Sequence, residues 1–148
     1  MTVMLLVHGT CVDLDGIGVL IIGPPGSGKS DLAIRLIDAG ARLVADDYLW
    51  LENADGGLVA AVPESIAGLL EVRGLGIVKL SYRDTCAVRL CVDLVAPDEI
   101  DRLPAAGQSA RYEGVEIRRL ALEGFEASAV AKVKLAARAV RDGIVVTE

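Results

Sequence analysis

An eight-residue loop motif at residues 23–30 constrains the fold of this chain more than any other feature. Its sequence fits G-x-x-x-x-G-K-[ST], the pattern of loops that wrap nucleotide phosphates: Gly23-Pro24-Pro25-Gly26-Ser27-Gly28-Lys29-Ser30. Such a loop must turn several backbone N–H groups inward, and glycine lets the backbone turn that tightly. Lys29 would place a cation between the β- and γ-phosphates, and the Ser30 hydroxyl would be a ligand of Mg²⁺. We therefore predict a nucleotide and magnesium site at this P-loop.

The flanking segments supply the context that the motif requires. Val19 to Ile22, directly before the loop, is a short apolar run typical of a buried strand, and residues 31–39 show an apolar face typical of a helix. Gly40 suits the position just after a helix. A helix that begins at the loop would also direct its positive N-terminal end at a bound anion. The alternative, a Gly-Pro connection that binds nothing, explains this combination less well.

The composition bounds the fold class and the kinds of partner. The chain has 148 residues, 53% of them hydrophobic, so it is long enough for one domain with a substantial core. Aliphatic residues and glycine outnumber aromatic residues, as in α/β sheets. A net charge of −6 argues against general nucleic-acid binding. Residues 1–7 lack the features of a signal peptide and are too few to span a bilayer, so we expect no membrane association and a cytoplasmic location.

The pattern of cysteines favours buried thiols in the reduced state over a metal-binding cluster. Cys11, Cys86 and Cys91 are odd in number and lie in strand-like runs without a C-x-x-C spacing. We therefore expect three buried, reduced thiols.

Alternating and periodic apolar patterns predict several strands and two main helices. Strands are expected at residues 3–12, 17–22, 42–45, 77–80, 85–95 and 115–122, with a hairpin at 48–52 and 58–62. Helices are expected at residues 31–39 and 127–141, with a short one at 65–70. Residues 97–110 are polar and rich in small side chains, which favours a loop. The prediction is one α/β domain with a mixed sheet, spanning residues 1–148.

Polar residues in or beside apolar runs are the candidates for chemistry. Asp46 and Asp47 follow an apolar strand, where a P-loop protein holds Mg²⁺ or activates a nucleophile, and a solvated strand end is an equally good explanation. His8 is the only histidine, for which composition alone favours a structural role. Glu71 could face a metal or pair with Arg73. Two further residues could supply a cation for a transferring group, although loop arginines are mostly solvated: Arg102 and Arg111.

Five segments, in order, resemble the catalytic domain of bacterial HPr kinase/phosphorylase. They are His8-Gly9, residues 16–21, the P-loop, residues 43–47 and the run Leu69-Leu70-Glu71-Val72-Arg73-Gly74-Leu75-Gly76-Ile77. The last run closely resembles that family's signature and is much rarer than a P-loop. The resemblance is strong from Val7 to Lys79 and weak beyond Lys79.

This resemblance implies a reaction and a set of site residues. The family phosphorylates a serine of the phosphocarrier protein HPr with ATP and Mg²⁺, and can reverse the modification with inorganic phosphate, releasing pyrophosphate. On the matching positions, Asp47 would be the base for the serine hydroxyl, and Lys29 would bind phosphate and stabilise the transferred charge. Ser30 and Glu71 would hold Mg²⁺, and His8 would lie beside the phosphates. One short match, Asp101-Arg102-Leu103, resembles the family's loop with a catalytic arginine and makes Arg102 the candidate.

Several differences from the family pattern narrow what the resemblance implies. The usual family member carries an additional N-terminal domain, and this chain resembles a short form that comprises only the catalytic domain. Pro24-Pro25 stands where the family more often has an acidic residue and serine. The family has a segment rich in Pro, Gly, Arg and Asn that is linked to dephosphorylation, and residues 120–129 lack it. The sequence therefore leaves open whether this chain catalyses the reverse reaction. The family forms hexamers, so the resemblance implies a homo-oligomer.

Three hypotheses for the function follow. The first is an ATP- and Mg²⁺-dependent serine kinase that phosphorylates HPr and regulates the phosphotransferase system. The second is a P-loop kinase of another protein or of a small molecule. The third is a non-enzymatic regulator controlled by its nucleotide, which would have no need of a base such as Asp47.

Overall fold

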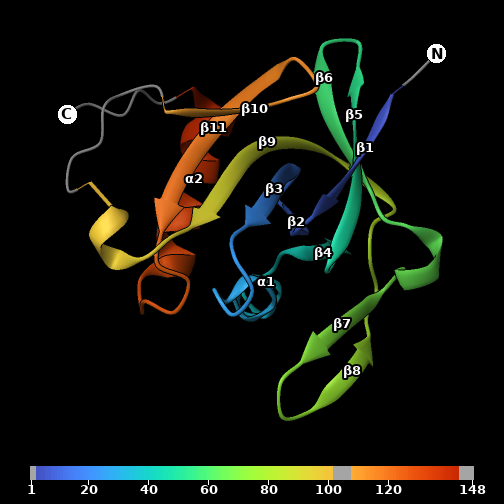
Figure 1. Cartoon of the computed structure of the whole chain (residues 1–148), viewed down its shortest axis with the longest axis vertical. Helices are drawn as coiled ribbons and strands as arrows, with labels where there is room; N and C mark the ends of the chain where they lie inside the picture. The colour runs from blue at the N-terminus through green and yellow to red at the C-terminus, as the bar shows by residue number, and fades with distance from the viewer. Residues whose placement is uncertain (1–2, 102–107, 144–148) are drawn as a thin grey trace.

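A curled mixed sheet of nine strands forms the centre of the part that the computed structural model describes, residues 3–101 and 108–143 (Figure 1). Its strands are β1 (Met4–His8), β2 (Thr10–Leu14), β3 (Ile17–Ile22), β4 (Arg42–Ala45), β5 (Tyr48–Ala54), β6 (Gly57–Ala61), β9 (Thr85–Leu94), β10 (Ser109–Tyr112) and β11 (Val115–Leu122). The order is β1-β5-β6-β9-β3-β2-β4, and β11 pairs with both β9 and β10. Strands β3 and β11 run parallel to β9, and the other pairings are antiparallel. The predicted single α/β domain with a mixed sheet is confirmed.

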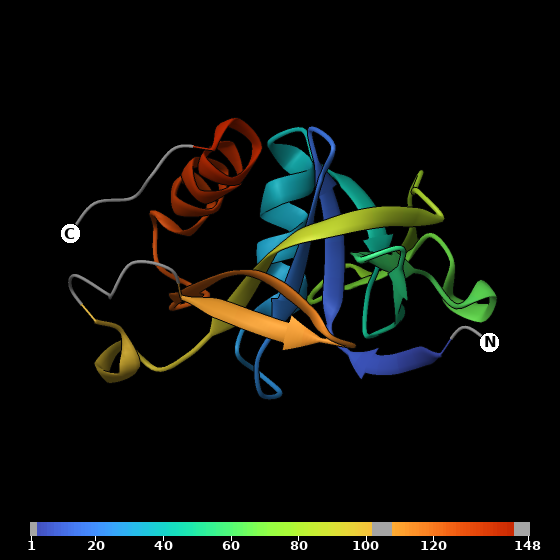
Figure 2. The same cartoon turned by 90° about the horizontal axis from the view of Figure 1, so that it is seen from above.

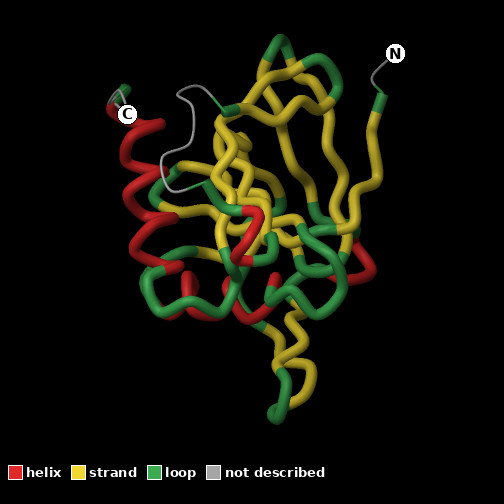
Figure 3. Tube along the Cα trace, turned by 60° about the vertical axis from the view of Figure 1, so that its left-hand side comes forward, coloured by secondary structure: helices red, strands yellow, loops and turns green. Residues whose placement is uncertain are grey.

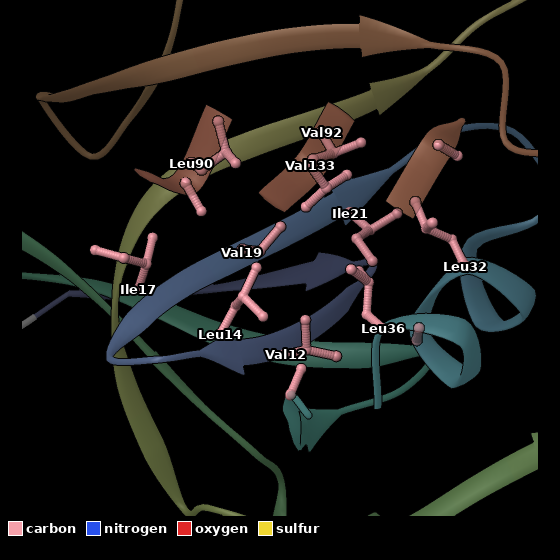
Figure 4. Close-up of a cluster of buried hydrophobic side chains, with 14 of the residues drawn as sticks. Val12, Leu14, Ile17, Val19, Ile21, Leu32, Leu36, Leu90, Val92 and Val133 are labelled. Carbon is pink, nitrogen blue, oxygen red and sulfur yellow. The ribbon is translucent and has the colours of Figure 1, made fainter. Parts of the chain in front are cut away.

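Two helices, α1 (Lys29–Asp38) and α2 (Ala129–Asp142), cover one face of this sheet (Figures 1 and 2). Leu32 and Leu36 of α1 and Val133 of α2 are buried against side chains of that face (Figure 4), which include Val12, Val19, Ile21, Leu90 and Val92. Both helices lie within two residues of their predicted bounds. Among the described residues, no helix has the length and apolar character needed to cross a bilayer.

The opposite face of the sheet is also buried. Because the sheet curls, the β5–β6 hairpin packs over that face of β3. Neighbouring residues of a strand point to opposite faces, so Leu20 of β3 lies on the other side from the helices. There it clusters with Leu49, Leu51 and Leu58 of the β5–β6 hairpin. Burial on both faces explains the continuous apolar run of β3 before the P-loop. The predicted hairpin at residues 48–62 is confirmed, with its turn at Asp55-Gly56.

The three cysteines are free and buried in this second cluster, as predicted. The Sγ atoms of Cys11 and Cys86 lie 3.5 Å apart. The hydrogen bond with Cys86, together with burial, holds the pKa of the Cys11 thiol well above its usual value. Burial and the nearby Asp93 carboxylate raise the pKa of the Cys91 thiol to about 12.

Residues 3–12 form two strands, so the prediction of a single strand there is wrong. The break is at Gly9, whose N–H donates to the Asp47 carbonyl oxygen at 3.0 Å. Strand β1 pairs with β5, whereas β2 pairs with β3 and β4. A Cβ at residue 9 would lie 3.1 Å from the Ile21 carbonyl oxygen, so glycine permits a close approach to β3. The apolar pattern continues across Gly9 and does not reveal this change of partners.

The helix predicted at residues 65–70 is also wrong. Glu64–Ile66 forms one turn of 3-10 helix, η1, and the chain then enters a hairpin of β7 (Leu69–Val72) and β8 (Gly76–Lys79). Between η1 and β7, Gly68 has a φ of 78°, a left-handed conformation that ends a helix. A segment this short is not a stable helix unless tertiary contacts support it. The hairpin projects from the body of the domain (Figures 1 and 3), and β8 contains most of the strand predicted at 77–80.

The loop predicted at residues 97–110 is only partly correct. Pro97–Glu99 forms a 3-10 turn, η2, and Ser109 begins β10, which pairs with β11. Residues 102–107 lie outside the described part of the chain. Strand β10 escaped prediction because it is short and carries only a weak alternation of apolar residues.

Candidate functional site

The P-loop lies between the end of β3 and the start of α1, as predicted. Gly26 and Gly28 have φ values of 80° and 100°, which residues with a side chain rarely adopt. The Ser27 N–H donates to the Pro24 carbonyl oxygen at 3.1 Å and closes the turn. Since α1 begins at Lys29, the loop stands at the N-terminal end of a helix, an arrangement that favours an anion.

The Lys29 ammonium folds back onto this loop. Its Nζ donates to the carbonyl oxygens of Gly23, at 2.8 Å, and of Pro24, at 3.2 Å. These bonds hold a positive charge beside the loop backbone, where it can form a charge-assisted bond with a phosphate. The phosphate-binding role of Lys29 stays a prediction.

Asp46 connects three elements at the site. Its Oδ1 accepts hydrogen bonds from the Ser30 hydroxyl, at 2.7 Å, and from the Thr10 hydroxyl, at 3.0 Å. The backbone N–H of Glu71 lies 3.5 Å from the other carboxylate oxygen. The residue is only 7% exposed, and a buried carboxylate needs such partners. Asp46 therefore joins the first turn of α1, the start of β2 and the β7–β8 hairpin.

Asp47, the next residue, points to a different environment. Its Oδ1 lies 3.0 Å from Nε2 of His8, and the two side chains are 64% and 48% exposed. Strands β1 and β5 pair with His8 opposite Tyr48, and the two rings lie 5.0 Å apart. The φ of Asp47 is 78°, a conformation that Asp and Asn tolerate better than most residues. The structure thus brings together two predicted site residues, His8 and Asp47, that are distant in sequence.

Glu71 lies in β7, and its side chain is exposed. The described residues contain no group of three or more His, Cys, Asp or Glu side chains arranged to hold a metal by themselves. The Ser30 hydroxyl and the Asp46 carboxylate nevertheless fit Mg²⁺, which binds few carboxylates and takes its remaining oxygen ligands from water and phosphate. The role of Glu71 as a metal ligand stays a prediction.

Two site residues were underestimated from the sequence. The sequence leaves Asp46 open between a site residue and a solvated strand end, and it predicts no role for Thr10, which is fully buried. The available signals were a carboxylate directly after a buried strand and a hydroxyl residue within an apolar strand. Neither signal shows which side chain turns inward.

The predicted arginine cannot be placed in the same way. Arg102 lies outside the described residues, and its catalytic role stays a prediction. Arg111, the other arginine considered, lies in β10 and is exposed.

Known proteins resemble this chain over most of its length. The family described as HPr Serine kinase C-terminal domain matches residues 1–142. The HPr kinase/phosphorylase of Geobacillus sp. (strain WCH70) is 39% identical over 127 residues, covering 78% of this chain and 41% of that protein. The HPr kinase/phosphorylase of Bordetella pertussis is 39% identical over 128 residues, covering 79% of this chain and 42% of that protein.

A solved structure shares the fold. It is described as the Hpr(Ser) kinase/phosphatase from Coxiella burnetii, and it matches with a TM-score of 0.83 at 25% identity. The match covers 95% of this chain and 98% of that chain. By contrast, the chain spans about 40% of the length of the curated relatives given above. Since the family match extends over nearly all of its residues, the chain belongs to the HPr serine kinase C-terminal domain family.

Proposed function

We propose that this chain is an ATP- and Mg²⁺-dependent kinase that phosphorylates a serine of the phosphocarrier protein HPr and so regulates a phosphotransferase system. The observation that carries the proposal is the opposite orientation of two consecutive carboxylates. Asp46 is buried and bonded to the P-loop Ser30, whereas Asp47 is exposed and paired with His8. Phosphoryl transfer requires one group at the phosphates and another at the acceptor, and these two orientations suit that division. The names of the relatives agree with the reaction.

Asp47 would act on the acceptor. A serine hydroxyl is a poor nucleophile, and a carboxylate within hydrogen-bond reach can take its proton as the phosphorus–oxygen bond forms. An exposed carboxylate is accessible to a serine on the surface of another protein. With the ring proton on Nε2, His8 donates to Asp47 and orients its carboxylate toward the acceptor.

The P-loop, Lys29, Ser30 and Asp46 would act on the nucleotide. The loop amides and the Lys29 ammonium would bind the phosphates, and Lys29 would exchange its bonds with the loop carbonyls for bonds with phosphate. Bound Mg²⁺ would offset negative charge on the phosphate oxygens. Ser30 and Asp46 would hold the metal, with Glu71 as the further predicted ligand from the adjacent hairpin.

A phosphotransfer assay tests this function. Incubation with HPr and Mg-ATP should place phosphate on a serine of HPr, detected by mass spectrometry. Asp47→Asn keeps a residue that tolerates positive φ, and it should lower the transfer rate about 10²- to 10⁴-fold while ATP affinity changes less than about twofold. Asp55→Asn is the matched control, because Asp55 also has positive φ and is exposed, but lies at the β5–β6 turn.

Other outcomes would select a different function. ATP binding without transfer to HPr would contradict the proposed acceptor, and a screen of other acceptors would then identify a different kinase. ATP binding without any turnover would indicate a nucleotide-dependent regulator. Incubating phosphoserine-HPr with inorganic phosphate tests the reverse reaction, for which the product to measure is pyrophosphate.

We also propose that residues 1–148 act as one catalytic domain in the cytoplasm, assembled into a homo-oligomer that is a hexamer by family resemblance. The edge strand β1 supports assembly, because Met4 and Leu6 are 47% and 50% exposed there. Light scattering after size-exclusion chromatography should give a mass of several chains, and Leu6→Lys should lower it. A single-chain mass for the wild-type protein would contradict the proposal.

A further inference from the structure

The segment that follows β11 packs directly against the P-loop. A Cβ at Gly124 would collide with the Ser27 carbonyl oxygen, so only glycine allows this approach. The Gly124 carbonyl accepts a hydrogen bond from the Arg35 guanidinium of α1. The Phe125 N–H donates to the Glu123 carboxylate at 3.1 Å. These contacts fix the segment beside the loop.

Phe125 is the only phenylalanine in the chain, and the segment holds it against the loop glycine that precedes Lys29. A Cβ at Gly28 would lie 3.0 to 3.3 Å from three of its ring carbons. The side chain is nevertheless 58% exposed. One part of the ring therefore lies against a P-loop glycine, and the rest faces solvent. An aromatic ring in this position offers a flat apolar surface to a planar group.

The sheet topology indicates which part of a nucleotide would reach this ring. Strands β3, β9 and β11 are parallel, and their carboxyl ends align, with Ile22 beside Asp93 and Leu94 beside Leu122. Ligands of such sheets bind outside the carboxyl ends of the strands. The sheet order puts β2 and β4 on one side of β3, and β9 and β11 on the other.

With its phosphates in the P-loop, a nucleotide would have its two ends on opposite sides of the loop. Asp46 follows β4, so the transferring phosphate would face the β4 side. The base, at the far end of the molecule, would then lie on the β11 side, where Phe125 covers Gly28.

We propose that the Phe125 ring binds the base of the nucleotide by stacking. This inference rests on the proposed function, because it requires a nucleotide whose phosphates occupy the P-loop. Stacking on an aromatic side chain contributes substantially to affinity and tolerates different bases, since every base has a π-face. Phe125 would therefore favour nucleotides over inorganic polyphosphates, with little preference among purines.

The test compares ATP with tripolyphosphate, which has three phosphates and no base. Calorimetry in Mg²⁺ would measure both dissociation constants for the wild-type chain and for Phe125→Ala. The substitution should weaken ATP binding about 5- to 150-fold and leave tripolyphosphate binding within about twofold. Phe125→Trp should keep ATP affinity within about threefold. Leu135→Ala is the control, because Leu135 is a similarly exposed apolar residue of α2, at 60%.

Four results would overturn the proposed stacking of Phe125 on the nucleotide base. An unchanged ATP affinity in Phe125→Ala would show that the ring does not contact the base, and a higher KM for HPr in that variant would assign the ring to the acceptor instead. An equal loss for ATP and tripolyphosphate would show that the ring only supports the loop. Equal wild-type affinities for the two ligands would overturn the base site and leave the phosphotransfer function standing. A wild-type chain that binds neither ligand would overturn both proposals.

Discussion

The Ser30 hydroxyl donates a hydrogen bond to Oδ1 of Asp46 at 2.7 Å and thereby joins the first turn of α1 to the residue that follows β4. Thr10 donates to the same oxygen. Two donors on one oxygen hold the Asp46 carboxylate in a single orientation next to the P-loop. Any ligand of Ser30 would therefore also be close to a buried negative charge.

The first prediction concerns this pair. Asp46→Asn removes a negative charge beside the proposed metal position, so phosphotransfer should fall about 10²-fold and require more Mg²⁺. Because Ser30 and Asp46 act as one unit, the double variant with Ser30→Ala should lose little more than the worse single variant. Rates measured over a series of Mg²⁺ concentrations check this, with the exposed Asp98→Asn as control. If the fold-loss in rate of the double variant equalled the product of the two single losses, Ser30 and Asp46 would not act as one unit.

The second prediction concerns His8. His8→Ala removes the partner of the Asp47 carboxylate, so transfer to HPr should slow by about tenfold or more, while ATP affinity stays the same. The half-exposed ring packs on Tyr48 at the surface, so the free energy of unfolding should change by less than about 1 kcal/mol. Steady-state kinetics and urea unfolding measure the two effects. Equal rates for His8→Ala and wild type would show that Asp47 does not depend on His8.

The third prediction concerns Gly124. Gly124→Ala would push the segment after β11 away from the P-loop, because the obstacle is the backbone of Ser27. The shift would also move Phe125 away from the base, so affinity for ATP should fall more than affinity for tripolyphosphate, and the free energy of unfolding should drop by about 1 to 3 kcal/mol. Gly57→Ala is the matched control, since a Cβ at Gly57 would make an ordinary contact of 3.6 Å with the Ala54 carbonyl oxygen. Indistinguishable behaviour of the two variants would contradict the close packing.

The fourth prediction concerns stability in alkali. Burial raises the pKa of Cys91 to about 12, whereas an ordinary thiol has a pKa near 9.0. Between these values the unfolded chain loses a proton that the folded chain keeps, so stability is unaffected below about pH 9 and falls as the pH rises further. Burial also raises the pKa of Tyr112 to about 12, which adds to the fall above the ordinary tyrosine value of 10.0.

Urea unfolding at about pH 8 and at about pH 10.5 measures this dependence. Cys91→Ala creates a cavity and should be less stable than wild type at the lower pH. It should then lose less stability on going to the higher pH, because it lacks the titrating thiol. If wild type and Cys91→Ala lost the same free energy of unfolding between the two pH values, the pKa of Cys91 would not be raised in the folded chain.

Much of the fold could be predicted from contiguous patterns. The run from Val19 to Ile22, the P-loop and the apolar face of residues 31–39 predicted β3, the loop and α1 nearly residue by residue. Such features depend on backbone conformation and periodicity within a short segment. Strand β11 was predicted with its exact bounds for the same reason, since its alternation and its flanking glycines are local.

Other features depended on contacts between distant segments. The apolar pattern across Gly9 is continuous, yet the chain changes strand partners there. A stretch with a helical appearance, residues 65–70, became a turn and a strand because β8 supplies hydrogen bonds that a short helix lacks. Strand pairing of this kind stabilises a segment through hydrogen bonds with residues that are distant in the sequence. A pattern read over a few neighbouring residues therefore cannot predict it.

The sequence alone determined that a P-loop motif lies between a strand and a helix, and its motifs named most of the candidate residues around that loop. Only the tertiary structure decided that Asp46 turns inward to Ser30, that Asp47 turns outward to His8, and that Phe125 lies against Gly28. Adjacent carboxylates are chemically identical in the sequence. Burial and the hydrogen-bond donors that the fold brings to each one give them different surroundings, and so different proposed roles.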